Sequence, residues 1–364
     1  MTRLSGTAVA ALMAMLAGCQ PAAEGSPSAS ASVRASATAE VTSAASAQPA
    51  APSATPEPLA WTELDAAGPA AREDHTWTLA GHGRTAYLFG GRDGGTVFGD
   101  LWSFDLETDT WAELAADGPP ARFGHESVWV DGVGLVIFAG QSGATFFDDL
   151  WAFDPAEGVW HQLPSAGESP VARYGTCAAV GPDGRLWISH GFTADGTRFS
   201  DTRAYDFASG TWSDETPDGE RPVDRCLHGC WWTDDGSLTL YAGQTTGVTA
   251  LGDRWSLGDA GWTELSGTAP PERNLYARTR LDGATLVFGG QALDGSFLDD
   301  LWLMPDSTAD AIALEAGGGP ARAGAEMVHD ATADRVLLFG GRDGDGAHAD
   351  LWQLRGNLEG QPSS

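Results

Sequence analysis

The stretch that decides the fold is Leu88-Phe89-Gly90-Gly91, an apolar run that ends in two glycines, together with Asp100-Leu101-Trp102 shortly after it. The glycine step occurs six times, and its last glycine is Gly91, Gly140, Gly191, Gly243, Gly290 or Gly341. The Asp-x-Trp element recurs with it, at Asp149, Asp253, Asp300 and Asp350, and as a degenerate copy at Asp201. From residue 61 onward the chain is therefore built from six copies of one unit of about 50 residues.

Each copy contains four short runs of β-type residues, separated by turns rich in Gly, Pro and Asp. One such four-stranded sheet cannot bury both of its faces, whereas six sheets packed radially bury them against one another. The sequence therefore predicts an all-β, six-bladed propeller over residues 59–357. The double glycine with its spaced aromatic residue and tryptophan resembles the kelch motif over residues 61–355, which implies a kelch-type propeller.

The two ends of the repeat region predict how the ring closes. The last copy stops after Leu351-Trp352-Gln353-Leu354, without a fourth strand. The region begins with Trp61-Thr62-Glu63-Leu64, which matches fourth strands of other copies such as Trp111-Ala112-Glu113-Leu114. We therefore expect the N-terminal strand to complete the last blade, so that no open sheet edge remains at the junction.

Composition supports this fold class and limits the partners. The 364 residues include 48 Gly and 15 Trp, and 42% of them are hydrophobic, enough for a large core. Asp and Glu number 50 against 20 Arg and no Lys, which leaves a formal charge of −30. That charge excludes a general affinity for nucleic acid or for anionic lipid surfaces.

The N-terminal segment predicts export and lipid anchoring. Arg3 precedes an apolar run that is too short to span a membrane, and Leu16-Ala17-Gly18-Cys19 resembles the lipobox of bacterial lipoproteins. We expect residues 1–18 to be the signal peptide, Cys19 to carry the acyl chains, and the Ala/Ser/Pro-rich residues 19–58 to form a disordered tether, with residues 358–364 as a tail. The expected location is the cell envelope, facing the periplasm or the exterior, with membrane contact through the anchor only.

Arginine recurs at one position before the first strand of every copy, and polar residues follow most of the glycine steps. In a kelch propeller both positions lie at the same mouth, and guanidinium groups suit carboxylates and phosphates. One interpretation is a mouth that binds an anionic sugar or an acidic peptide; the other is that each arginine pairs with a local carboxylate, such as that of the Asp-x-Trp element, and braces its blade. The predicted mouth residues are Arg72, Arg122, Arg173, Arg225, Arg273, Arg322, Arg92, Gln141, Gln244, Gln291 and Arg342.

Residues three positions after the repeat arginines include histidine and tyrosine: His75, His125, His228 and Tyr276. Galactose oxidase, a larger kelch-type enzyme, holds copper with two His and two Tyr, so the resemblance raises the possibility of a metal site. The chain offers no second channel tyrosine at that height, and a histidine there is more often a buried hydrogen-bonding group. We therefore expect neither metal nor cofactor.

A second enzymatic alternative is mutarotation of sialic acid, since six-bladed kelch proteins of bacterial envelopes include such epimerases. This chemistry needs one acid/base carboxylate beside the substrate and an arginine for the sugar carboxylate. The candidate carboxylates near the arginines are Glu73, Asp74, Glu126, Asp224 and Glu326.

Three cysteines follow Cys19, in the first strands of the third and fourth copies. Counted from the repeat arginines, Cys177 and Cys230 lie at nearly equal heights on facing sides of adjacent blades, and an exported protein permits disulfides. We expect a Cys177–Cys230 bridge, with Cys226–Cys230 or a Cys/His metal cluster as alternatives. Cys226 would then be an odd thiol.

These features together favour a monomeric, lipid-anchored binding module for a protein or carbohydrate ligand. If the arginines line the mouth, that ligand is expected to be anionic. An envelope carbohydrate enzyme and a structural envelope component with no discrete ligand are the alternatives. The sequence favours a binding protein over an enzyme but does not decide between them.

Overall fold

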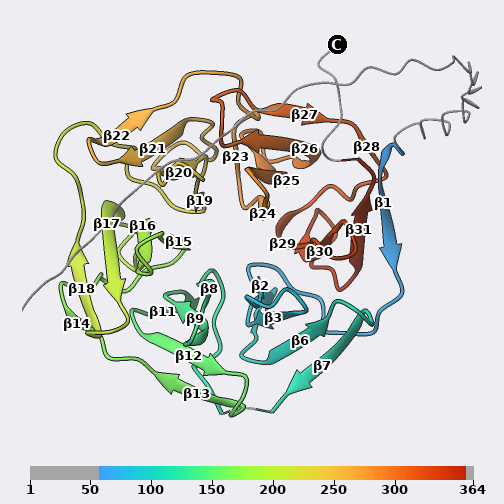
Figure 1. Ribbon diagram of the computed structural model, residues 1–364, viewed down its shortest axis with the longest axis horizontal. Coiled ribbons are helices and arrows are strands. Elements are labelled where there is room, and N and C mark those ends of the chain that lie inside the picture. Colours follow the sequence, from blue (N-terminus) through green and yellow to red (C-terminus); the bar gives the residue numbers. More distant parts are fainter. Residues whose placement is uncertain (1–56, 116, 358–364) are drawn as a thin grey trace, which may run out of the picture. The chain divides into compact units, whose positions relative to one another are not determined.

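A computed structural model describes residues 57–115 and 117–357, and within them all regular structure is β. Six sheets surround one axis, and each blade begins with its innermost strand and ends with its outermost one (Figure 1). The prediction of an all-β, six-bladed kelch-type propeller is confirmed. No helix in this part of the chain is long and apolar enough to cross a membrane.

Blade 1 shows how the repeat folds. Its strands are β2 (Thr76–Leu79), β3 (Thr85–Phe89), β6 (Leu101–Asp105) and β7 (Thr110–Leu114), paired antiparallel in that order from the axis outward. Gly90 and Gly91 directly follow β3 with φ values of 65° and 97°, a conformation that glycine adopts without strain. The glycine step therefore ends the second strand and turns the chain into the loop that carries β4 (Arg92–Asp93) and β5 (Thr96–Val97).

The other blades repeat this order, with local additions. Blade 2 consists of β8 (Glu126–Val130), β9 (Gly134–Phe138), β12 (Leu150–Asp154) and β13 (Val159–Gln162), with the loop strands β10 (Gln141–Ser142) and β11 (Thr145–Phe146). Blade 3 has β15 (Cys177–Val180), β16 (Leu186–Phe192), β17 (Arg198–Asp206), β18 (Thr211–Asp214) and β14 (Ala166–Gly167), and blade 4 has β19 (Gly229–Trp232), β20 (Leu238–Tyr241), β21 (Arg254–Gly258) and β22 (Gly261–Glu264). Blade 5 has β24 (Ala277–Leu281), β23 (Arg273–Asn274), β25 (Ala284–Ala292), β26 (Phe297–Pro305) and β27 (Ile312–Leu314).

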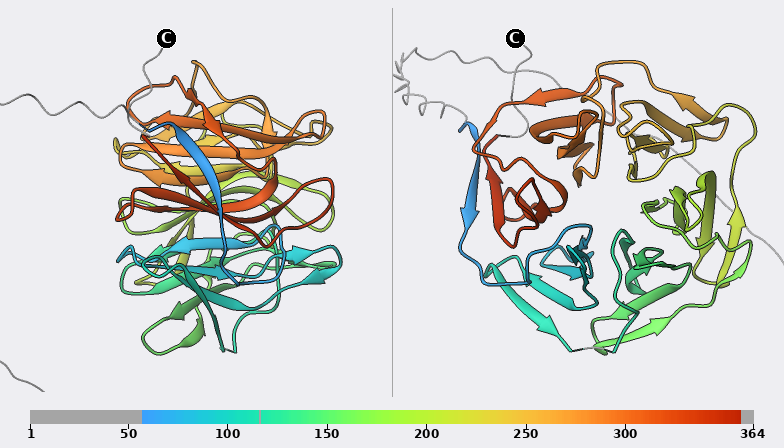
Figure 2. Two further views of the ribbon diagram at one scale, coloured as in Figure 1. Left: turned by 90° about the vertical axis from the view of Figure 1, so that its right-hand side faces the viewer. Right: turned by 180° about the vertical axis from the view of Figure 1, so that it is seen from behind.

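Blade 6 joins the two ends of the propeller. It contains β29 (Ala323–Asp330), β30 (Arg335–Arg342), β31 (Leu351–Arg355), β1 (Leu59–Leu64) and the short β28 (Ala316–Gly317). β1 pairs antiparallel with β31 from Ala60 opposite Arg355 to Leu64 opposite Leu351, so the first strand of the chain is the fourth strand of the last blade (Figure 2). The predicted closure is confirmed.

Aromatic side chains from neighbouring blades make up much of the core. Trp77, Phe104 and Trp111 of blade 1 pack with Phe339 of blade 6, where the Trp111 and Phe339 ring centroids are 5.0 Å apart. Burying such rings removes large apolar areas from water, which accounts for the high tryptophan content of the blades.

Four predicted features lie outside the described residues: the signal peptide, the lipidation of Cys19, nearly all of the tether, and the tail 358–364.

Candidate functional site

The six repeat arginines lie in the interior of the blades, not at a mouth. Five have no exposed area and Arg322 is 4% exposed. Each guanidinium donates two hydrogen bonds to the carboxylate of the Asp-x-Trp aspartate in its own blade and a third to a backbone carbonyl of the glycine step. The pairs are Arg72–Asp100, Arg122–Asp149, Arg173–Asp201, Arg225–Asp253, Arg273–Asp300 and Arg322–Asp350.

The tryptophan of the Asp-x-Trp element completes this unit. Trp151 Nε1 donates to Asp149 Oδ2 at 2.8 Å, and the Arg122 guanidinium stacks 4.0 Å from the centroid of the Phe147 ring. Burial alone would raise the pKa of the Asp149 carboxyl, but the hydrogen bonds and charge of Arg122 outweigh it and hold that pKa below its usual value. The six guanidiniums are buried and bonded to aspartates of their own blades, so the interpretation of these arginines as ligand-binding groups is wrong, and they brace the blades.

A ring of backbone hydrogen bonds surrounds the axis two residues after each arginine. Asp74 N–H donates to the carbonyl of Gly324, Gly324 to Leu275, Leu275 to Leu227, Leu227 to Gly175, Gly175 to Gly124, and Gly124 to Asp74, at 2.8 to 3.4 Å. All six residues have φ between 51° and 66°. The ring of six peptide groups thus narrows the central channel at the end where the arginines were expected to form a mouth.

The remaining predicted mouth residues lie outside this ring but engage neighbouring groups. Arg92 is 2.9 Å from Asp74 and 3.2 Å from Glu73, and Arg342 is 2.5 Å from Glu73. Burial, with the charge of Asp74, raises the pKa of Glu73 to about 7 despite both arginines. These two guanidiniums are partly exposed, yet each already has an acidic partner.

The glutamines of this predicted set also bond within the protein. Gln141 and Gln291 donate to backbone carbonyls of their own turns, those of Gly143 and Gly295, and Gln244 lies 3.6 Å from the sulfur of Cys226.

The histidines at the third position after the arginines lie between blades. His125 Nε2 is 2.9 Å from the hydroxyl of Thr76 in the neighbouring blade, and His75 packs edge-on against Phe339. Burial lowers the pKa of His75 to about 3, so it is neutral. Residues 57–115 and 117–357 contain no group of three or more His, Cys, Asp or Glu side chains that could hold a metal.

The candidate site lies on the other side of the backbone ring, inside the channel. A cavity of about 510 Å³, which we call the axial pocket, runs along the inner strands β2, β8, β15, β19, β24 and β29. It extends to Ala331 in the turn after β29. A smaller inner chamber of about 60 Å³ separates it from the backbone ring, and Glu126, Arg278 and Glu326 line both spaces.

These three charged residues form the floor of the axial pocket. Arg278 on β24 of blade 5 reaches Glu126 on β8 of blade 2, with Nη2 and Oε2 3.3 Å apart. Blades 2 and 5 are opposite each other, so this ion pair crosses the channel. Glu326 of blade 6 has no hydrogen bond or ion pair among the described residues, although Arg278 is near enough to affect its pKa.

Burial raises the pKa of both carboxyls. That of Glu126 is about 7, because burial outweighs the charge of Arg278 and a backbone hydrogen bond from Ala178. That of Glu326 is about 8, because the charges of Glu126 and Asp74 add to the effect of burial. Two carboxyls that exchange protons near neutral pH, with one guanidinium between them, can bind a charged ligand or transfer a proton.

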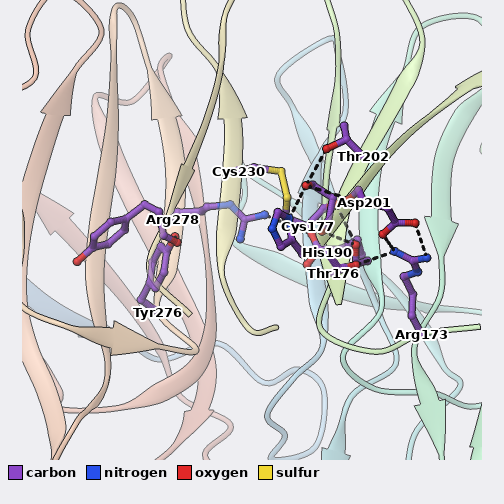
Figure 3. Close-up of a disulfide and its surroundings, with 12 residues drawn as sticks. Arg173, Thr176, Cys177, His190, Asp201, Thr202, Cys230, Tyr276 and Arg278 are labelled. Atoms are coloured by element: carbon purple, nitrogen blue, oxygen red, sulfur yellow. Dashed lines mark hydrogen bonds and ion pairs between the residues drawn. A yellow bond between two sulfur atoms is a disulfide. The ribbon is translucent and has the colours of Figure 1, made fainter. Parts of the chain in front are cut away.

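A glycine next to the neighbouring disulfide leaves room for this arginine. Cys177 on β15 and Cys230 on β19 are joined, with Cα atoms 5.6 Å apart, and the Arg278 side chain extends toward them (Figure 3). A Cβ atom on Gly229 would lie 2.9 Å from Arg278 Cδ and 2.5 Å from the Tyr276 hydroxyl, so a glycine is needed where other blades carry a side chain. Cys226 is free and buried.

The sequence analysis included Glu126 and Glu326 among five candidate carboxylates but missed Arg278. The other three lie elsewhere: Glu73 and Asp74 bind Arg92, and Asp224 is exposed. A signal was present, because Arg278 is the one charged residue five positions after a repeat arginine; the other five positions hold Trp77, Ser127, Ala178, Cys230 and Met327.

Comparison with known proteins agrees with this architecture. Residues 53–243 match the model of the KLHDC2/KLHL20/DRC7 Kelch-repeats domain. Two Arabidopsis thaliana proteins, acyl-CoA-binding domain-containing proteins 4 and 5, are 37% and 36% identical over 76 residues, which is 20% of this chain. The match covers 11% and 12% of those two proteins, so it concerns the repeat alone. Since the matched family model covers more than half of the sequence, the chain belongs to the KLHDC2/KLHL20/DRC7 Kelch-repeats domain family.

Proposed function

We propose that the protein is a lipid-anchored, extracytoplasmic binding module that holds its ligand in the axial pocket. A kelch propeller is consistent with a protein-binding module, and the proposed ligand is a protein side chain or a small carbohydrate. The observation that carries this proposal is the cavity of about 510 Å³ whose floor consists of three charged side chains, at repeat positions where most copies carry an uncharged residue. A ligand breaks sixfold symmetry, and these residues are where the symmetry of the inner strands is broken.

The binding test is a glycan and peptide array at low and high salt, with the protein and its Glu326→Gln variant. Ligands of the axial pocket should lose signal with the variant. Signal that fades with salt but is unchanged by the variant would instead favour the face that carries Arg92 and Arg342, where an anionic ligand was expected from the sequence.

Anchoring and export are proposed from residues 1–58 alone. The lipobox-like Leu16-Ala17-Gly18-Cys19 and the tether that follows support a mature chain attached to the envelope through Cys19. Wild-type protein should fractionate with membranes and incorporate labelled fatty acid, and Cys19→Ala should do neither. The closed ring leaves no blade edge unpaired at its junction, which supports a monomer, testable by light scattering.

A second candidate function is mutarotation of an acidic sugar, and one specific observation favours it. Glu126 and Glu326 have pKa values near neutrality and lie beside Arg278 in the axial pocket. A carboxyl with a pKa near the working pH can both donate and accept a proton, while Arg278 would bind the sugar carboxylate. Anomer exchange of N-acetylneuraminic acid, followed by NMR, should then accelerate with wild-type protein and not with Glu326→Gln. A galactose oxidase-like reaction has no such support, because His75 and His125 pack between blades.

A further inference from the structure

The charges at the floor of the axial pocket do not balance. Glu126 and Arg278 form an ion pair, and each side chain is about one-fifth exposed, at 18% and 20%. Glu326, which lines the same space, has no hydrogen-bond or ion-pair partner in the described chain. With both carboxyls ionised the floor therefore has a net charge of −1.

The surroundings do not supply the missing positive charge. Arg280, nearer the pocket entrance, donates to both carboxylate oxygens of Asp306 and also lies 3.4 Å from Asp234. His329 also lines the pocket, and burial lowers its pKa, so it is neutral at pH 7. Below the floor, Asp74 lines the inner chamber, and its Oδ1 atom is buried without a hydrogen-bond partner. Asp74 pairs with Arg92 through its other oxygen, so the inner chamber offers Glu326 no free positive charge.

We propose that the axial pocket binds an organic cation, an alkylammonium or guanidinium group, which lies against the unpaired carboxylate of Glu326 and the outer side of Glu126. This inference rests on the proposed function, because it takes the axial pocket to be the ligand site. The cation supplies the donors that Glu326 lacks and leaves the Glu126–Arg278 pair intact. An anion would have to displace Glu126 from Arg278 and would then lie between two carboxylates.

The walls and the body of the protein fit the same ligand. Trp77, Trp231 and Trp232 line the pocket together with aliphatic side chains, so an alkyl or aromatic stem finds apolar contact above a charged floor. The formal charge of −30 attracts cations toward the molecule. Proton release provides a further signature, because a cation at Glu326 favours the ionised form of a carboxyl whose pKa is about 8.

The test is calorimetric titration of the full-length protein at pH 7 with n-butylammonium, its neutral analogue butyramide and its anionic analogue butyrate. Nα-acetyl-lysine amide is titrated in parallel, to separate a free amine from a protein side chain as the source of the cation. Butylammonium or the lysine derivative should bind about tenfold or more tightly than butyramide and butyrate, as one charge-assisted contact predicts. Titrations in two buffers of different ionisation enthalpy should show proton release on binding.

The variants make the result specific to the floor. Glu326→Gln keeps the shape of the side chain and should weaken cation binding about tenfold and abolish proton release. Glu264→Gln, on an exposed residue of β22, should leave both unchanged. The proposal would be overturned if butyrate bound more tightly than butylammonium, or if Glu326→Gln bound cations as tightly as the wild type. It would also be overturned if no cation gave a binding signal at 10 mM, which is about the weakest affinity expected of a useful single contact.

The outcomes also separate this inference from the proposed function. If array ligands require Glu326 but no cation binds, the axial pocket remains the ligand site and its preference for cations is wrong. If cations bind the floor but no array ligand depends on it, the cation site stands and the pocket is not where the natural ligand binds.

Discussion

Substituting Asp149 with Asn tests whether the repeated Arg–Asp pair braces the blade. Arg122 has no exposed area, and its guanidinium donates two charge-assisted hydrogen bonds to the Asp149 carboxylate, at 2.7 and 3.0 Å. Asparagine has nearly the same shape but offers one acceptor oxygen and no charge, so the variant leaves a buried guanidinium with only carbonyl partners. Removing one member of a buried pair costs roughly 3–5 kcal/mol.

The expected result is a large loss of thermal stability. For a propeller of about 300 residues, 3–5 kcal/mol corresponds to a decrease in Tm of about 5–8 °C, measured by calorimetry or circular dichroism. Asp93→Asn is the matched control, since Asp93 is an exposed residue in the loop strand β4, and its Tm should change by less than about 1 °C. A Tm for Asp149→Asn that equals the control value would refute the bracing role and make the arginine available for a ligand again.

Three further measurements test the closure, the titration of the channel and the thiols. Trp61→Ala should lower the free energy of unfolding by about 3–5 kcal/mol, because Trp61 on β1 is 4% exposed and its ring centroid lies 4.8 Å from that of Phe288 in blade 5. Thr62→Ala, on the exposed side of β1, is the control. Equal unfolding midpoints of the two variants would contradict a stabilising role of β1 in ring closure. Because burial raises the pKa of Glu126 to about 7 and of Glu326 to about 8, ionising them opposes folding, so stability should fall as pH rises from 5 to 9, by on the order of 2 kcal/mol after allowance for water in the channel. Glu326→Gln should flatten that decline, and a variant profile as steep as that of the wild type would show that Glu326 is not responsible. Non-reducing peptide mapping should recover Cys177 linked to Cys230, and Cys226 should react with a thiol reagent only after denaturation, since it is 1% exposed and burial raises its pKa; rapid labelling of the native protein would contradict this.

The fold was predictable because each blade repeats the same local chemistry. Gly90 and Gly91 adopt positive φ where β3 ends, and the equivalent residues of the other five copies also have positive φ, so one motif sets the same backbone conformation six times. The closure was predictable for the same reason, since Trp61-Thr62-Glu63-Leu64 has the pattern of a fourth strand and the last copy lacks one.

The role of the arginines was predicted only as one of two alternatives, ligand binding or pairing with the aspartate of the same copy. Arg122 and Asp149 lie 27 residues apart, and only the folded blade shows that the carboxylate faces the guanidinium and not the solvent. The charged floor was harder still to predict, because Glu126, Arg278 and Glu326 come from three blades. Their proximity depends on the diameter of the channel and on the space that Gly229 leaves, neither of which spacing along the chain reveals.

The repeated and the unrepeated residues therefore have different consequences for function. A residue present in all six blades has six equivalent environments, and here each such arginine is buried and donates to an aspartate of its own blade. The charged residues on the inner strands differ from those at the same positions in most other copies. They therefore have no repeated acidic or basic partner within their own blade. Arg278 pairs with Glu126 across the axis and Glu326 has no partner among the described residues, so the channel contains a carboxyl that is available to a ligand. A ligand that recognises this protein through charge is thus expected in the channel, and because Glu326 is a carboxylate when ionised, that ligand is expected to be a cation.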